Sequence, residues 1–76
     1  MPLPEDTLLA TEQSEMVEQL LSRLPYVYQQ VARLVDMEGL DYQDAAKILD
    51  LPMGTVKSRL ARARVKFRSL FEQSRL

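Results

Sequence analysis

Two helical patterns in this chain meet with almost no residues between them. The first begins at Asp41, where an acidic residue at the cap position and a second one, Asp44, three residues later are typical of a helix start. It ends near Asp50, and Pro52 suits the first turn of the long helix that follows. Because so short a joint makes the two helices cross at a steep angle, the sequence predicts a helix-turn-helix over about residues 41–70.

Two further helices are expected before this joint. An apolar repeat at helical spacing, which Thr11 could cap, runs until Pro25 interrupts it. A second repeat runs from about Pro25 to Glu38. Residues 1–10, which are rich in proline and acidic side chains, are expected to form a flexible tail. Because no segment shows strand-like alternation, the pattern predicts an all-α fold, a compact four-helix domain over residues 11–76.

Two positions in the connections suit left-handed backbone geometry. Gly39 is expected to end the second helix, because glycine adopts positive φ angles without steric cost. Asp50 stands where many helix-turn-helix turns carry glycine, and aspartate can replace glycine there because it tolerates left-handed geometry better than most residues do. Both residues are therefore interpreted as helix ends.

The composition excludes most enzyme and metal chemistry. The chain contains no cysteine and no histidine, so disulfides, thiolate ligands and the commonest general base are all missing. Asp41 and Asp44 are interpreted as a cap and its partner, and not as a catalytic pair. No apolar run approaches the length of a membrane span, and the N-terminus does not resemble a signal peptide. We therefore expect a cytoplasmic protein with no catalytic residue, metal, cofactor, small-molecule substrate or membrane contact.

The charge of the chain is strongly segregated, although its formal net charge is only −1. Residues 1–50 carry ten acidic and three basic side chains, whereas residues 51–76 carry seven basic side chains and one acidic one, Glu72. Six of these bases fall between Lys57 and Arg68, a segment without any acid. A solvated helix usually intersperses glutamate among its bases for pairing. The segregation therefore favours a nucleic-acid-binding face over a merely solvated one.

The long helix separates an apolar stripe from this basic face. At about 100° per residue the apolar side chains gather on one side: Val56, Leu60, Ala63, Phe67, Leu70 and Phe71. Met37 and Met53 are expected to fill remaining gaps in the core. In a major groove, Arg62 suits the O6 and N7 atoms of guanine, Ser58 suits either kind of base, and Ala61 suits a thymine methyl. These three side chains are the predicted base-reading residues.

Three blocks of sequence carry a family resemblance. They are Leu24-Pro25; Met37-Glu38-Gly39-Leu40-Asp41-Tyr42, which leads into Asp44-Ala45-Ala46; and Gly54-Thr55-Val56-Lys57-Ser58-Arg59-Leu60, followed by Arg62-Ala63-Arg64. In order and spacing they resemble the fourth domain of extracytoplasmic-function (ECF) sigma factors, in the sigma-70 family. The resemblance implies that the helix starting near Pro52 recognises the −35 element of double-stranded promoter DNA. It also implies that the domain binds the β flap of the RNA polymerase core, and that an anti-sigma factor competes for such a surface.

The resemblance further implies roles for individual side chains. Ser58, Ala61 and Arg62 would face bases, which agrees with their chemistry. Contacts to the DNA backbone are expected from Thr55, Lys57, Arg59 and Arg64, and by position or chemistry from Lys66 and the Tyr42 hydroxyl. The family's domain that melts DNA at the −10 element is absent from this sequence. This chain alone is therefore not expected to initiate transcription.

Two alternatives remain open. A sigma-like module could bind an anti-sigma factor or another regulator without touching DNA, although such a module would have no need of an intact basic face. Residues 56–71 could instead form a basic amphipathic helix on a membrane surface, but Phe67 and Phe71 would then have to leave the core. Promoter binding is therefore the preferred hypothesis.

Overall fold

The computed structural model describes residues 15–74, and over this range the chain is an all-α domain of four helices without a strand. The described part of the first helix covers residues 15–22. The other elements are α2 (Tyr26–Val31), the π-helix η1 (Ala32–Met37) that continues it, α3 (Tyr42–Leu49) and α4 (Met53–Ser74). The predicted four-helix fold is confirmed. The proposed cap Thr11 and the proposed tail, residues 1–10, lie outside the described residues.

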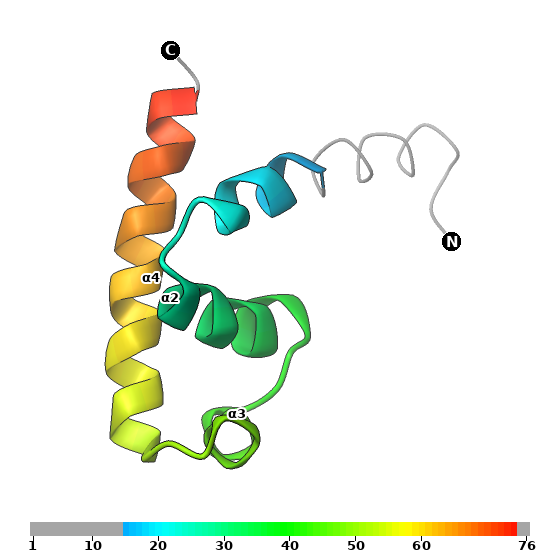
Figure 1. Ribbon diagram of the computed structural model, residues 1–76, viewed down its shortest axis with the longest axis vertical. Coiled ribbons are helices and arrows are strands. Elements are labelled where there is room, and N and C mark those ends of the chain that lie inside the picture. The colour runs from blue at the N-terminus through cyan, green and yellow to red at the C-terminus, as the bar shows by residue number, and fades with distance from the viewer. Residues whose placement is uncertain (1–14, 75–76) are drawn as a thin grey trace, which may run out of the picture.

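The long helix α4 forms one side of the domain, and the other helices are stacked along its other side (Figure 1). α3 lies near the start of α4, the α2–η1 helix lies across its middle, and the segment 15–22 lies farther towards its C-terminal half. Because α3 and α4 are joined by only three residues, they form the tight corner that the sequence predicts. α4 therefore presents one face to the core and the opposite face to solvent.

The core is small and almost entirely aliphatic. Its buried side chains are Leu20, Leu21, Leu24, Val31, Ala32, Ala45, Ala46, Val56, Leu60 and Ala63. The predicted stripe of α4 is buried from Val56 to Ala63, but Phe71 is exposed because the last turns of α4 extend beyond the other helices (Figure 1). The prediction that Met37 and Met53 fill gaps is wrong. Both side chains are exposed and neither belongs to the core, because Met37 is the last residue of η1 and Met53 is the first of α4.

Both ends of α3 are fixed by hydrogen bonds, and the one at its start is the cap that the sequence predicts. At the start, the Asp41 carboxylate accepts a hydrogen bond of 2.8 Å from the backbone N–H of Asp44. At the end, Asp50 has left-handed geometry (φ 55°, ψ 49°), and the N–H of Leu51 donates to the carbonyl of Ala46 at 3.0 Å. This is the bond of a Schellman motif. The turn before α4 is therefore set by local backbone bonding.

The second helix has the predicted extent but not the predicted regularity. Pro25 caps α2, and Gly39 (φ 79°) follows the helix in left-handed geometry, as expected. Between them, Ala32–Met37 winds as a π-helix, and the N–H of Glu38 donates to the carbonyl of Arg33 at 2.9 Å, five residues back. A π segment widens the helix and is common at functional sites. The apolar repeat of the sequence gives no sign of it.

Candidate nucleic-acid interface

One face of α4 is buried while the opposite face is open to solvent. Val56 and Leu60 are at most 1% exposed, whereas Ser58, Ala61 and Arg62 are all exposed. The rise from Ser58 to Arg62 is about 6 Å, at 1.5 Å per residue. The three predicted base-reading side chains therefore lie together on one accessible surface, which we call the outer face.

Basic side chains surround this outer face. Lys57 and Lys66 are exposed and Arg59 is half-buried, and α4 carries no acidic residue before Glu72. None of these three bases therefore has an acidic partner on that stretch of α4. Their charges are available to an anion that approaches from outside, such as a DNA phosphate.

Tyr42 connects α3 to the first turns of α4. Its side chain is half-buried against the core, and the ammonium nitrogen of Lys57 lies 5.6 Å from the centre of its ring. At this distance a cation–π interaction contributes about 0.5–1 kcal/mol at an exposed site. Half-buried Thr55 accepts a 3.3 Å hydrogen bond at its carbonyl from the Ser58 hydroxyl. The corner between α3 and α4 thus contains three of the residues predicted to contact DNA phosphates: Tyr42, Thr55 and Lys57.

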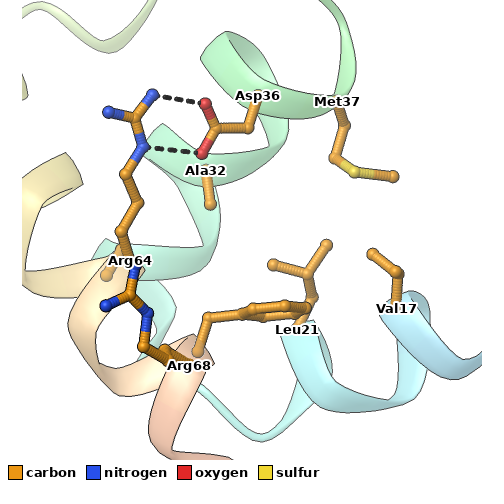
Figure 2. Close-up of a pocket in the computed structure, with 9 residues that line it drawn as sticks. Val17, Leu21, Ala32, Asp36, Met37, Arg64 and Arg68 are labelled. Carbon is orange, nitrogen blue, oxygen red and sulfur yellow. Dashed lines mark hydrogen bonds and ion pairs between the residues drawn. The ribbon is translucent and has the colours of Figure 1, made fainter. Parts of the chain in front are cut away.

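Arg64 is bound to an acidic residue of η1 (Figure 2). Its guanidinium donates to both oxygens of Asp36, at 2.6 Å from Nη2 and 3.1 Å from Nε. The hydrogen bond to Asp36 is the main cause that raises the pKa of Arg64 above its ordinary value. The role of Asp36 could not be predicted from the sequence, because it lies 28 positions from Arg64 and nothing local links the two residues. Arg64 is therefore the one predicted backbone-contacting residue with an ion-pair partner among residues 15–74.

A second ion pair joins η1 to the first helix. The Arg33 guanidinium donates to both carboxylate oxygens of Glu18, at 2.7 and 2.8 Å. This hydrogen bonding lowers the pKa of Glu18 below its ordinary value and raises that of Arg33. Both ion pairs found within residues 15–74 thus involve η1, which ties the first helix to α4.

An apolar groove lies on the side of α4 away from the outer face. It has a volume of about 360 Å³ and lies between the first helix, η1 and α4. The residues that line it are Val17, Leu21, Ala32, Asp36, Met37, Ala63, Arg64, Phe67 and Arg68. Figure 2 shows the Arg64–Asp36 pair and Arg68 along one side of it. We call this the first-helix groove. α4 thus borders two different surfaces, a basic outer face and an apolar groove with charged groups beside it.

Comparison with known proteins identifies the family. Residues 14–67 match the family described as sigma-70, region 4. The chain belongs to this family. It is 41% identical over 61 residues to the ECF RNA polymerase sigma-E factor of Haemophilus influenzae, and 38% identical to those of Escherichia coli K12 and Salmonella typhimurium LT2. Each alignment covers 80% of this chain but only 32% of the relative, so the chain spans about a third of the relatives' length.

The region 4 match includes every predicted site residue, from Tyr42 to Lys66. It confirms the resemblance to the fourth domain of ECF sigma factors that was inferred from the sequence. The contacts of the individual side chains stay predictions. Within residues 15–74 no group of three or more acidic, histidine or cysteine side chains could hold a metal ion. None of the described helices is both long and apolar enough to cross a membrane.

Proposed function

We propose that this region 4 domain acts in the cytoplasm by recognising the −35 element of promoter DNA with the outer face of α4. The observation that carries the proposal is the acid-free stretch of α4, on which Ser58, Ala61 and Arg62 are exposed directly opposite the buried stripe. A helix that enters a major groove needs short polar or forked side chains on that face, with cations beside them. Thr55, Lys57, Arg59, Lys66 and Tyr42 supply the phosphate contacts in this proposal, and Arg64 adds one when it is released from Asp36.

The test is a titration of the chain against a promoter-like duplex and a scrambled duplex at several salt concentrations. If about four to six phosphates are engaged, the logarithm of the affinity falls against that of the salt concentration with a slope of about −4 to −5. Arg62→Ala should remove about 1–3 kcal/mol of the preference for the promoter-like duplex. Arg23→Ala is the matched control, because it also removes one exposed arginine, and Arg23 lies in the turn before α2 and not on α4.

Arg23→Ala should leave the preference between the two duplexes unchanged. Undetectable or salt-insensitive binding to both duplexes, by protein shown to be folded, would contradict the proposal. That outcome would favour the alternative, a sigma-like module that binds a regulator such as an anti-sigma factor without contacting DNA.

We further propose that the first-helix groove docks on the β flap of RNA polymerase. The support is an open apolar groove in which Met37 is 51% exposed, beside the charged pair of Asp36 and Arg64. Exposed apolar surface rimmed by polar groups is typical of protein-protein contacts. Docking on the polymerase would also add contacts that one small DNA-binding module lacks.

Met37→Glu tests this docking, because the side chain is exposed and its replacement should not disturb the core. Binding to an isolated β-flap fragment should weaken at least tenfold, while binding to DNA should change little. Ile48→Glu is the control, since Ile48 is 61% exposed on α3 and does not line the groove. Equal weakening by both variants, or by neither, would contradict the assignment of this groove.

A further inference from the structure

The outer face of α4 also carries a large apolar side chain, that of Val65. Val65 is 70% exposed, seven residues after Ser58, which places the two within about 20° of each other around the helix. A shallow groove of about 370 Å³ lies at this point, lined by Tyr28, Ala61, Arg62, Val65 and Lys66. Half-buried Tyr28 packs against the core and forms the side of the groove that comes from α2. We call this the Val65 groove.

The surroundings of the Val65 groove favour DNA over an apolar protein segment as its occupant. Arg62 and Lys66 line it, and no acidic side chain does. The groove also contains Ala61 and Arg62, so it continues the surface proposed to read bases. A positively charged groove that continues a DNA-reading face is complementary to an anionic duplex. Its occupant should therefore be an apolar group carried by DNA.

Thymine carries such a group. The major-groove edge of a base pair presents hydrogen-bond donors and acceptors, and the C5-methyl of thymine is its one apolar feature. The major groove is about 12 Å wide and admits an α-helix. The rise from Ser58 to Val65 is about 10.5 Å at 1.5 Å per residue, which corresponds to about three base pairs at about 3.4 Å each. A helix that lies along the groove keeps both side chains near the base edges.

We infer that Val65 is a specificity-determining residue, and that the Val65 groove receives the C5-methyl of a thymine beyond the bases read by Ser58 and Arg62. This inference rests on the proposed promoter recognition and adds a chemical preference to it. It also requires α4 to lie along the major groove, since a helix that enters end-on would lift Val65 away from the bases.

The first experiment is a selection of the chain on duplexes with a randomised segment, followed by sequencing. Wild-type protein should enrich one sequence that includes a preferred thymine. Val65→Ala should lose the preference at that position only, and Ile48→Ala, which shortens another exposed aliphatic side chain outside the groove, should enrich the wild-type sequence.

The second experiment removes the methyl group itself. Each thymine of the selected duplex is replaced in turn by deoxyuridine, and affinity is measured by fluorescence anisotropy. Burial of one methyl group corresponds to about a fourfold change in affinity, so one replacement should weaken wild-type binding by about that factor. Val65→Ala should bind the thymine and deoxyuridine duplexes equally at that position, with its other preferences intact.

The outcomes separate this inference from the function on which it rests. Failure of the folded wild-type chain to select any sequence would overturn promoter recognition and this inference together. Selective binding with no deoxyuridine effect, or with the same effect in Val65→Ala as in wild type, would overturn only the role of Val65.

Discussion

Arg64 has two possible partners, Asp36 and a DNA phosphate, and it can bind only one of them fully. Both side chains of the pair are partly exposed, Arg64 by 54% and Asp36 by 38%, so solvent screens their attraction. Exposed pairs of this kind contribute about 0.2–1 kcal/mol. Release of Arg64 by DNA would therefore cost about 1.4-fold to 5-fold in affinity. We expect the ion pair with Asp36 to weaken the contact between Arg64 and a DNA phosphate in the wild-type chain.

A double-mutant cycle tests this competition through the salt dependence of DNA binding. Each phosphate contact contributes about 0.9 to the slope of log affinity against log salt concentration. In the wild type, Arg64→Ala should change the slope by clearly less than 0.9. In the Asp36→Asn background, where Arg64 has lost its ionic partner, the same substitution should change it by about 0.9. Asp36→Asn alone should strengthen binding at low salt.

Glu38→Gln controls for the change in net charge, since Glu38 is exposed and lies two residues from Asp36. Glu38→Gln should strengthen DNA binding only by removing a negative charge that repels DNA. It should not alter the change in salt slope that Arg64→Ala causes. The reasoning would be refuted if Arg64→Ala changed the slope by about 0.9 already in the wild type. A change near zero in both backgrounds would instead remove Arg64 from the DNA contacts.

Three further predictions concern the fold. Asp41→Ala removes the 2.8 Å bond to Asp44 and should lower the free energy of unfolding by about 1 kcal/mol, or the melting temperature by about 4–8 °C; an unchanged melting temperature would contradict this. At Asp50 (φ 55°), Val should destabilise by about 1–2 kcal/mol while Gly should not, as denaturant unfolding would show; equal effects would argue against left-handed geometry. Because Arg33 lowers the pKa of Glu18, their pair stabilises the fold above the ordinary carboxyl pKa, and this contribution is lost as the pH falls through the lowered value. Glu18→Gln should flatten that acid-side loss in a pH series of melting curves, and an unchanged profile would count against the pair.

Much of the fold could be predicted because its determinants are local in the sequence. The cap at Asp41, the left-handed residues Gly39 and Asp50, and the apolar stripe of α4 each depend on residues within a few turns of one another. The charge segregation likewise located the basic helix, and the order of the motif blocks indicated the family.

The features that escaped prediction depend on contacts across the fold. The partners in the Arg64–Asp36 pair are 28 residues apart, and those in the Arg33–Glu18 pair are 15 apart. No periodicity reveals which opposite charges will meet at such separations. The π geometry of η1 was missed for another reason: the segment has only six residues, too few for the apolar spacing to distinguish i→i+5 from i→i+4 hydrogen bonding. Val65 was overlooked since its neighbour Tyr28 comes from another helix.

The two proposed surfaces share one helix, and this decides which substitutions can separate them. Ala63 and Phe67 line the first-helix groove, while Arg62 and Val65 lie on the other side of the same turns of α4. A change that shifts α4, such as the truncation of fully buried Leu60, would alter both surfaces and also cost about 2–5 kcal/mol of stability. Its effect on DNA binding could not be assigned to either surface. Exposed positions such as Met37 and Arg62 avoid this coupling, because each contributes to one surface and neither supports the core. If Met37→Glu nevertheless weakened DNA binding as strongly as Arg62→Ala does, the two surfaces would have to be coupled through α4 itself.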